Sequence, residues 1–515
     1  MADLSRRAFL GTGTAMGLGA MLAPAAEAKP YDPMPAKWDE EVDVLIVGSG
    51  FAGLAAALEA KKKGANVVVL EKMRTLGGNS IINGGIMAVP GSPMQKKNGI
   101  KDTPELLAED MLREGQGLND PNKVRTLVNQ ALPTWQWTRD ELGVEWNMDH
   151  LVQEGGHSVP RCAITGNGSG SAIVTKQIAK CKELGIPLRT RVFMETIIRD
   201  TDGRVKGLKV REGYKFRDNT SGRVKYIRAK KGVILCYGGF GADVAYRMHQ
   251  DPKLTDKFQT TNQPGATSEG WREANRIGCQ IIQADWIQCG PWNSPDEKGM
   301  GIALYFAQSA AAMFGIWVNC ATGKRFVDEL ANRKVRADAV INAANKGQLC
   351  IAVANKEGIE MMQQIHHNIL AKQLERGVVY EFPTLKAMAE KFNIPEAALQ
   401  KTVDEYNAGL KAGKDPLNRY INKDCKPMVN GPWYCSKLSP KVHHCMGGIL
   451  TDMKGRALDC TNDKPIPGLY AAGESTGGVH GAVRLGSCAV LDCLVNGRIC
   501  GQAGECQMIF RRNCS

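Results

Sequence analysis

Three glycines followed by an acid form the residue pattern with the clearest chemistry in this chain. Gly48, Gly50 and Gly53 give G-x-G-x-x-G, and Glu71 follows about 20 residues later. In such patterns the first glycine allows a tight turn, the second lets the backbone approach a pyrophosphate, and the third lets a helix pack on a strand. The acid is placed to bind a ribose hydroxyl. The pattern predicts a dinucleotide site.

The elements that must position these residues occur in the required order. The β-branched run 42–47 predicts a buried strand, and 54–63 predicts a helix that ends at Gly64. The run 66–70 predicts a second strand that ends at Glu71. This order favours a nucleotide site over a glycine turn that only shapes the backbone.

Further glycine-rich segments predict the rest of the cofactor site. Small residues at 76–80 and 83–85 let a loop lie against phosphates and a flat ring, while 155–171 is either a flexible loop or a support under the cofactor. Runs 224–230 and 232–239 predict strands, 466–474 a strand closing on the cofactor, and 485–499 a final helix. The cofactor-binding candidates from these segments and their surroundings are Lys72, Gly78, Asn79, Ser80, Gly84, Gly85 and Gly239.

The region from 285 to 438 has a different character. It lacks a glycine fingerprint and carries helical patterns at 384–392 and 395–410, the second with Pro395 suited to a first helical turn. We expect an inserted second domain in which helices predominate, so that the first domain is built from both ends of the chain.

The first 28 residues are typical of an export signal. Ser5-Arg6-Arg7 begins a twin-arginine pattern, and small residues at 26–28 offer a cleavage site. The alternative, a membrane anchor, is less favoured because the apolar run is short and interrupted by glycines. We therefore predict a periplasmic protein.

Composition excludes several classes of function. The formal net charge is +13, yet the basic residues are dispersed and no nucleic-acid motif occurs, so no nucleic acid is expected. The 16 cysteines include no C-x-x-C-H haem motif and no paired C-x-x-C spacing, so no metal is expected. They remain either buried thiols or disulfides formed after export.

Five motifs connect the chain to a known family. They are GGNS at 77–80, TTNQPG at 260–265, GKRFVDE at 323–329, HHCMGG at 443–448 and GESTGGVHGAVRL at 473–485. In their order and spacing the chain resembles the flavoprotein portion of soluble periplasmic fumarate reductases of the flavocytochrome c type, from Asp43 to Arg498. More broadly, it is similar to the flavoprotein subunits of fumarate reductase and succinate dehydrogenase.

The resemblance implies an α/β fold with a Rossmann-like FAD-binding domain, residues 39–284 and 440–515, and an inserted α+β capping domain, residues 285–439. It implies hydride transfer from flavin N5 to one carbon of an activated double bond, with a proton donated to the other carbon by Arg333. His443 and Arg484 match carboxylate ligands, with Gln288 and Gly290 also at the substrate. The remaining cofactor positions implied are Gly473, Glu474, Arg484 and Ser487.

The chain also departs from the family. The haem domain is absent, which predicts a separate c-type cytochrome as electron donor, and a single dinucleotide fingerprint predicts no use of NAD(P)H. The histidine that anchors flavin covalently is absent, so FAD should be non-covalent. Gly290 stands where a substrate histidine is expected, and the proton relay falls at Gln308 and Ala311.

These departures predict an unsaturated carboxylate other than fumarate. A glycine at 290 removes a donor and opens space, which favours a monocarboxylate with a bulky substituent, such as an aryl acrylate. The aromatic residues nearby are either ring-binding or ordinary core: Trp286, Trp292, Tyr305, Phe306 and Phe314. Two other hypotheses stay open, a dehydrogenase that desaturates a carboxylate or ketosteroid-like substrate and a non-catalytic flavin electron carrier. Retention of Arg333, His443 and Arg484 argues against the carrier.

Overall fold

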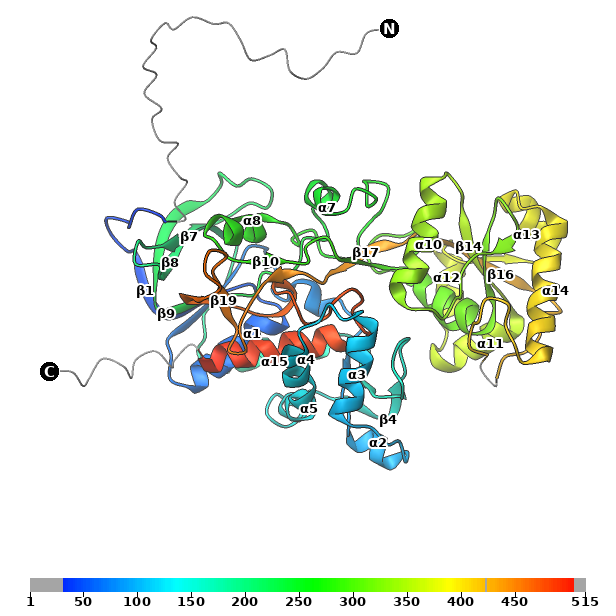
Figure 1. Cartoon of the computed structure of the whole chain (residues 1–515), viewed down its shortest axis with the longest axis horizontal. Helices are drawn as coiled ribbons and strands as arrows, with labels where there is room; N and C mark the ends of the chain where they lie inside the picture. Colours follow the sequence, from blue (N-terminus) through cyan, green and yellow to red (C-terminus); the bar gives the residue numbers. More distant parts are fainter. Residues whose placement is uncertain (1–30, 422–423, 504–515) are drawn as a thin grey trace, which may run out of the picture.

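The computed structural model describes residues 31–421 and 424–503. The predicted signal segment therefore lies outside the described residues, as do Cys506 and Cys514. No helix in the described part is long and apolar enough to span a membrane. The molecule is elongated, with a large α/β domain at one end and a smaller domain at the other (Figure 1).

An eight-stranded sheet forms the centre of the larger domain. Strand β1 (Glu40–Val47) lies between β2 (Val67–Glu71) and β9 (Arg223–Leu235) and is parallel to both. Beyond β2 lies β6 (Leu188–Thr190), and beyond β9 lie β20 (Pro465–Ala471) and β19 (Arg456–Leu458). The runs predicted as two strands at 224–230 and 232–239 form the single strand β9. Strand β8 (Val205–Glu212) pairs antiparallel with β9, and β7 (Val192–Arg199) pairs antiparallel with β8.

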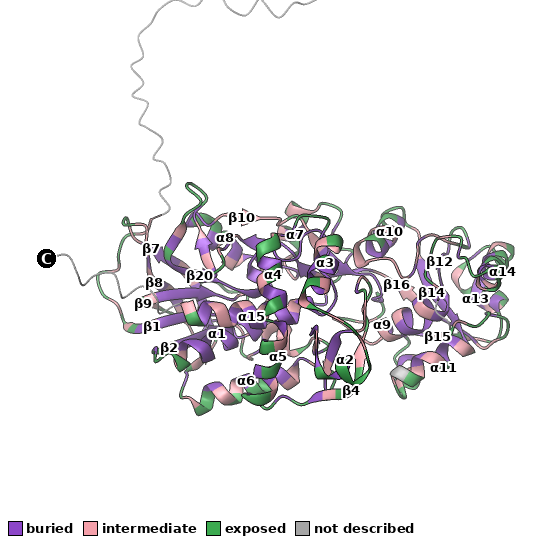
Figure 2. Cartoon of the chain, turned by 60° about the horizontal axis from the view of Figure 1, so that its bottom comes forward, coloured by how far each residue is buried: buried purple, intermediate pink, exposed green. Residues whose placement is uncertain are grey.

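Both ends of the chain contribute to this domain. Helix α1 (Phe51–Lys62) packs against α15 (Cys488–Ala503), and the two lie side by side in Figure 1. Their backbones approach closely because a Cβ at Gly497 or Gly501 would overlap backbone atoms of Ala52 or Ala56. In Figure 2, α1 and β1 are buried along most of their length.

A second layer packs against α1 and α15 of the larger domain. It contains the three-stranded sheet of β3 (Ile86–Ala88), β5 (Cys162–Thr165) and β4 (Trp146–Val152). Around it are α2 (Pro93–Lys97), α3 (Pro104–Glu114), α4 (Pro121–Asn129), α5 (Ala131–Asp140) and α6 (Ser171–Glu183).

The inserted domain is built around a sheet as well as helices. Five antiparallel strands lie in the order β13 (Lys324–Arg325), β12 (Ile316–Asn319), β14 (Cys350–Asn355), β16 (Trp433–Leu438) and β15 (Tyr380–Phe382). Alternate residues of β14 enter two separate cores, Ile351 and Val353 on one face and Ala352 and Ala354 on the other. The α+β class is thus correct, and helical residues do outnumber strand residues in the described part of this domain, although the central sheet was not resolved strand by strand from the sequence because β14 is buried on both faces and lacks polar alternation.

Helices surround this sheet, and a two-stranded ribbon connects the two domains. The helices are α10 (Arg333–Asn345), α11 (Lys356–Ile365), α12 (Ile369–Glu375), α13 (Leu385–Phe392) and α14 (Glu396–Ala412). Pro395 stands at the N-cap of α14 rather than inside its first turn. The ribbon pairs β11 (Ile287–Gly290) with β17 (Lys441–Cys445). Strand β17, which contains His443, lies between the two domains in Figure 1.

Candidate active site

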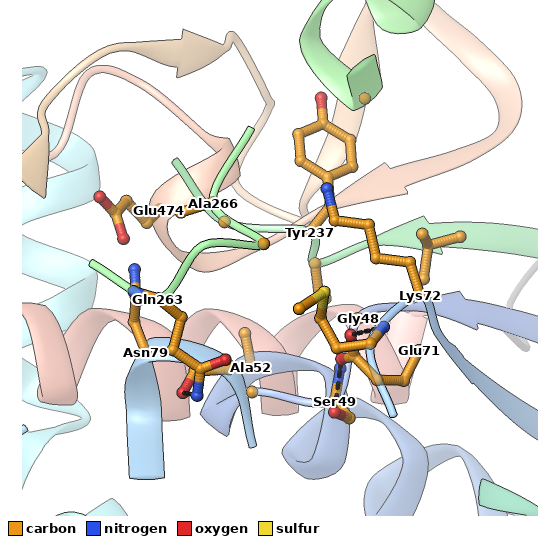
Figure 3. A pocket seen from close by; sticks show the side chains of 18 of the residues that line it. Gly48, Ser49, Ala52, Glu71, Lys72, Asn79, Tyr237, Gln263, Ala266 and Glu474 are labelled. Atoms are coloured by element: carbon orange, nitrogen blue, oxygen red, sulfur yellow. Dashed lines mark hydrogen bonds between the residues drawn. The ribbon is translucent and has the colours of Figure 1, made fainter. Parts of the chain in front are cut away.

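A long cavity lies where the carboxyl ends of β1, β2 and β9 meet the loops around Asn79 and Ala266. It contains about 980 Å³ of space, part of which is open to solvent. Figure 3 shows Glu71 and Ser49 toward one side of this cavity and Asn79 and Glu474 toward the other. Predicted cofactor residues that line it are Gly48, Gly50, Glu71, Lys72, Gly78, Asn79, Ser80, Gly239 and Glu474.

The turn between β1 and α1 requires its glycines. Gly48 has φ +104°, and a Cβ there would overlap the carbonyl of Cys236. A Cβ at Gly53 would overlap the carbonyl oxygen of Gly48, so the helix could not pack on the strand. Gly50 caps α1 without a side-chain hydrogen bond. Phe51 N, the first N–H group of α1, donates to Ser80 Oγ at 2.9 Å, and the N–H groups that follow it in the first turn suit a pyrophosphate.

Glu71 is held by this same turn. Its Oε2 accepts hydrogen bonds from Ser49 Oγ at 2.6 Å and Ser49 N at 3.2 Å, and its Oε1 accepts one from Met73 N at 2.9 Å. Ser49 was not singled out from the sequence because it occupies a variable position of the motif. The carboxylate is thus fixed at the end of β2, beside the space for a ribose.

The opposite end of the cavity is polar and adjoins the interdomain ribbon. Asn79 Nδ2 donates to Asn262 Oδ1 at 2.5 Å, and Glu474 Oε1 accepts from Cys445 N at 3.0 Å. A Cβ at Gly239 would contact Glu474 Oε1 and Cys445 Sγ, so this glycine keeps the space narrow but open. Burial raises the pKa of Glu474 to about 7. Asn79 and Glu474 would hold a flavin ring at this end.

Six predicted cofactor positions lie outside the cavity lining, namely Gly53, described above, and five others. Gly85 lets the loop pack against Ser169, and Gly84 meets nothing closer than Ile86. Gly473, with φ +71°, packs beside Ala52 and Cys493. Ser487 donates to Glu154 Oε1 at 3.3 Å, and Arg484 belongs to the substrate side described next. The geometry therefore gives them supporting or substrate-side positions.

The three predicted catalytic residues come together at this end. Burial, followed by the positive charges of Arg484 and Arg333, holds the pKa of His443 well below its usual value. Arg484 is 5% exposed and its Nε has no hydrogen-bond partner among the described residues. Burial, followed by the charge of Arg333, lowers the pKa of Arg484 to about 10, so it remains a cation at neutral pH.

Neighbouring groups orient these side chains. Thr261 Oγ1 lies 2.8 Å from His443 Nδ1, which leaves Nε2 for a ligand. Gln288 Nε2 donates to the carbonyl of Arg484 at 3.0 Å, while the buried Gln288 Oε1 lacks a partner within the described chain. A buried unpaired oxygen of this kind is available to accept a hydrogen bond from a bound polar molecule. The sequence motif that contains Thr261 had been noted, but its contact with His443 spans 182 residues.

Arg333 is positioned from both domains. It begins α10, and its guanidinium lies over the ring of Trp292 at 4.8 Å from the centroid. On the other side Arg333 Nη2 forms an ion pair with Glu154 Oε2. Glu154 directly precedes the glycine-rich segment 155–171, which was predicted to be a loop or a support under the cofactor. Its role was missed from the sequence because no local pattern there points to Arg333.

The space expected beside Gly290 is filled. A Cβ at Gly290 would overlap Asn293 Oδ1, and Asn293 is fully buried. Of the five aromatic residues, Trp292 is the one that contacts a predicted catalytic residue. Phe306 and Phe314 are buried core, Tyr305 packs on His366, and Trp286 packs against Lys334. These contacts do not by themselves provide an open pocket beside Gly290, so a bulky substituent stays a prediction.

The predicted relay positions lie in the inserted domain. Gln308 belongs to a π-helical segment (Ala307–Ala312), and its Oε1 accepts from Arg336 Nη1 at 2.8 Å. Ala311 is fully buried and has no side-chain donor or acceptor. The hydrogen bond of Gln308 thus leads to Arg336, one turn of α10 beyond Arg333.

Comparison with known proteins agrees with this geometry. A family model described as an FAD binding domain matches residues 43–490. The chain belongs to this family of FAD-binding proteins. A 41% identical relative, the acrylate reductase flavoprotein subunit of Shewanella woodyi, aligns over 96% of this chain and 97% of its own length. The urocanate reductase of Eggerthella lenta is 35% identical, covering 90% of this chain and 74% of that protein.

Solved structures give the same result. The open conformation of a flavocytochrome c3 fumarate reductase superimposes with a TM-score of 0.75 at 31% identity, covering 91% of this chain and 79% of that one. A 3-ketosteroid Δ1-dehydrogenase from Sterolibacterium denitrificans superimposes with a TM-score of 0.74 at 20% identity, which shows the fold alone. The predicted family, α/β fold class and FAD are confirmed, and the protein is an FAD-dependent oxidoreductase of the fumarate reductase type.

Proposed function

We propose that this protein reduces the carbon–carbon double bond of a small unsaturated monocarboxylate, such as acrylate or another short 2-enoate. The observation that carries the proposal is the convergence of Arg333, His443 and Arg484 at one end of the cofactor cavity, where Asn293 fills the space beside Gly290. The 41% identity to an acrylate reductase flavoprotein subunit supports a small substrate.

His443 and Arg484 would bind the substrate carboxylate. Arg484 is a buried cation with an unpaired Nε, so a carboxylate supplies both the charge and the acceptor that this side chain lacks. His443 is neutral at pH 7, and Nε2 is left to donate when Thr261 occupies Nδ1. Binding here also polarises the conjugated double bond, because negative charge that develops on the carboxylate is stabilised.

Bound FAD supplies a hydride to one carbon of the double bond. Arg333 donates a proton from its guanidinium to the other carbon, so that one hydride and one proton saturate the bond. Guanidinium is a very weak acid in water, but a carbanion-like carbon is far more basic than the solvent. The stacking of Arg333 on Trp292 holds the donor in a fixed plane.

A reduction assay with reduced viologen as donor tests the proposal. The panel is acrylate, crotonate, cinnamate, urocanate and fumarate. We expect acrylate or crotonate to have the highest kcat/KM, with fumarate lower by ~10²-fold because its second carboxylate finds no free cation. Preference for cinnamate or fumarate would overturn the small-monocarboxylate assignment. Failure to reduce any enoate would overturn the reductase itself.

FAD is proposed to be non-covalent, because Asn79-Ser80-Ile81 offers no attachment histidine. Acid precipitation should leave the yellow colour in the supernatant as FAD. Colour that stays in the pellet would contradict this.

We also propose that the protein acts in the periplasm with a separate c-type cytochrome as donor, rather than with NAD(P)H. The twin-arginine pattern at 5–10 supports export, and relatives include proteins named fumarate reductase (cytochrome). Cell fractionation tests the location. Anaerobic mixing with NADH should leave the flavin oxidised, whereas a reduced multihaem cytochrome should reduce it.

A further inference from the structure

Glu154 is an acid in a site that is expected to attract acids. It lies just after β4, on the larger domain, and its Oε2 pairs with Arg333 at the start of α10. Its Oε1 accepts from Ser487 Oγ at 3.3 Å. One carboxylate oxygen is thus engaged by a group of the inserted domain and the other by a group of the larger domain.

The carboxylate is charged and partly enclosed. Burial alone would raise the pKa of Glu154, but the charges of Arg333 and then Arg484 hold it below its usual value. Its side chain keeps 21% exposure, and that of Arg333 14%. Glu154 in turn acts to raise the pKa of Arg484. The negative charge therefore acts on both arginines proposed to handle the substrate.

Charge matching then limits the substrate. Arg484 and neutral His443 can accept one carboxylate, and Arg333 already has a carboxylate partner in Glu154. Arg336 also lies over Trp292, but its Nη1 is already hydrogen-bonded to Gln308 Oε1 and to the carbonyl of Glu329. Glu474, whose pKa is about 7, adds no positive charge at the other side. A second substrate carboxylate would face Glu154 in a poorly solvated space, where repulsion between like charges is strong.

We propose that Glu154 is a specificity-determining residue. The Glu154 carboxylate occupies the place at Arg333 that the second carboxylate of a dicarboxylic substrate would otherwise take. The site is thereby restricted to unsaturated monocarboxylates. This rests on the proposed reductase function and explains why the arrangement of Arg333, His443 and Arg484 selects a smaller acid. The rival role is a purely structural tie between the two domains, which would affect all substrates alike.

The test compares Glu154→Gln with Asp149→Asn in the flavin-loaded enzyme. Gln keeps the size of the side chain and removes its charge. Asp149, on β4, is exposed and pairs with Lys97, away from the substrate site, so its variant is the matched control. The readouts are kcat/KM for acrylate and fumarate, and calorimetric binding of the saturated acids propionate and succinate to the oxidised enzyme.

Glu154→Gln should raise the fumarate-to-acrylate ratio of kcat/KM by about tenfold or more and tighten succinate binding by a similar factor. Asp149→Asn should change neither. A ratio within twofold of the wild type, in a variant that still reduces acrylate, would overturn the inference and leave the reductase function standing. A wild-type enzyme that reduces no enoate would instead sink the proposed function.

Glu154→Asp covers the case in which Glu154→Gln fails to retain FAD. The shorter side chain keeps the charge but withdraws it from Arg333, so succinate binding should strengthen by a smaller factor than in Glu154→Gln. Succinate excluded as strongly from Glu154→Asp as from the wild type would contradict the specificity role.

Discussion

The cofactor cavity and the substrate junction depend on different properties of the chain. The cavity is shaped by backbone: Gly48 and Gly53 fit because side chains would overlap neighbouring carbonyls. The junction is shaped by side-chain charge: Arg333, Arg484, His443 and Glu154 come from four separate segments and interact mainly through electrostatics. A change at the cavity should therefore remove the cofactor, whereas a change at the junction should remove turnover and leave the cofactor bound.

Arg333→Ala should show the largest effect of this kind. Loss of the proton donor should lower kcat by ~10²-fold or more, because a general acid acts in the transition state. Flavin content and Tm should stay near those of the wild type. Lys334→Ala is the control, since Lys334 is the next residue of α10 and pairs with Asp338. A near-normal kcat for Arg333→Ala would remove this residue from the mechanism.

Gly48→Ala should have the opposite profile. Its Cβ would overlap the Cys236 carbonyl at a φ of +104°, so we expect a loss of about 3 kcal/mol or more of stability together with loss of FAD. Gly64→Ala is matched, because Gly64 also has positive φ but meets nothing within 4 Å. FAD content and Tm measure the difference. Retention of FAD by Gly48→Ala at the level of Gly64→Ala would break the proposed distinction between the two regions.

The same distinction explains what the sequence could predict. Gly48, Gly50 and Glu71 are close in sequence, so local spacing located the cavity end that they form. Arg333, His443 and Arg484 were found through family resemblance, and the structure brings them together.

Contacts between distant segments could not be predicted. The pairing of Glu154 with Arg333 spans 179 residues and joins two domains, and no local pattern encodes it. The filling of the Gly290 space by Asn293 was equally hidden, because a glycine in a sequence does not show which neighbour occupies its missing side chain.

The ribbon between the domains gives a smaller, pH-dependent test. Lys441, at the start of β17, is fully buried and donates to the carbonyls of Glu297 and Gly299. Burial lowers the pKa of Lys441 from 10.5 to about 8. Between those values the unfolded chain binds more protons than the folded protein, so the contribution of Lys441 to stability rises with pH.

Lys441→Met lacks this contribution. The stability of the wild type relative to the variant should therefore grow by ~2 kcal/mol between pH 7 and pH 9.5, seen as a widening gap in Tm. Lys437→Met is the control. Burial lowers the pKa of Lys437, but the hydrogen bond and charge of Asp296 outweigh this and raise the pKa overall. The difference in Tm between the wild type and Lys437→Met should therefore not change between pH 7 and pH 9.5. If the difference in Tm between the wild type and Lys441→Met became smaller as the pH rises, the lowered pKa of Lys441 would be contradicted.

The smallest expected effect concerns the neutral His443. Thr261 Oγ1 lies 2.8 Å from His443 Nδ1, and the low pKa of His443 means that this hydrogen bond, rather than a charge, fixes which ring nitrogen faces the substrate. Thr261→Val keeps the shape and removes the hydroxyl, which should weaken carboxylate binding by about 1 kcal/mol. KM for the enoate should rise by ~5-fold while kcat changes less, because the contact is made in the ground state as well as the transition state. Thr255→Val serves as the comparison, since the Thr255 hydroxyl has no hydrogen-bond partner among the described residues. Equal KM values for the two variants would show that His443 is oriented by packing instead, and that the junction, like the cavity, depends on shape at this point.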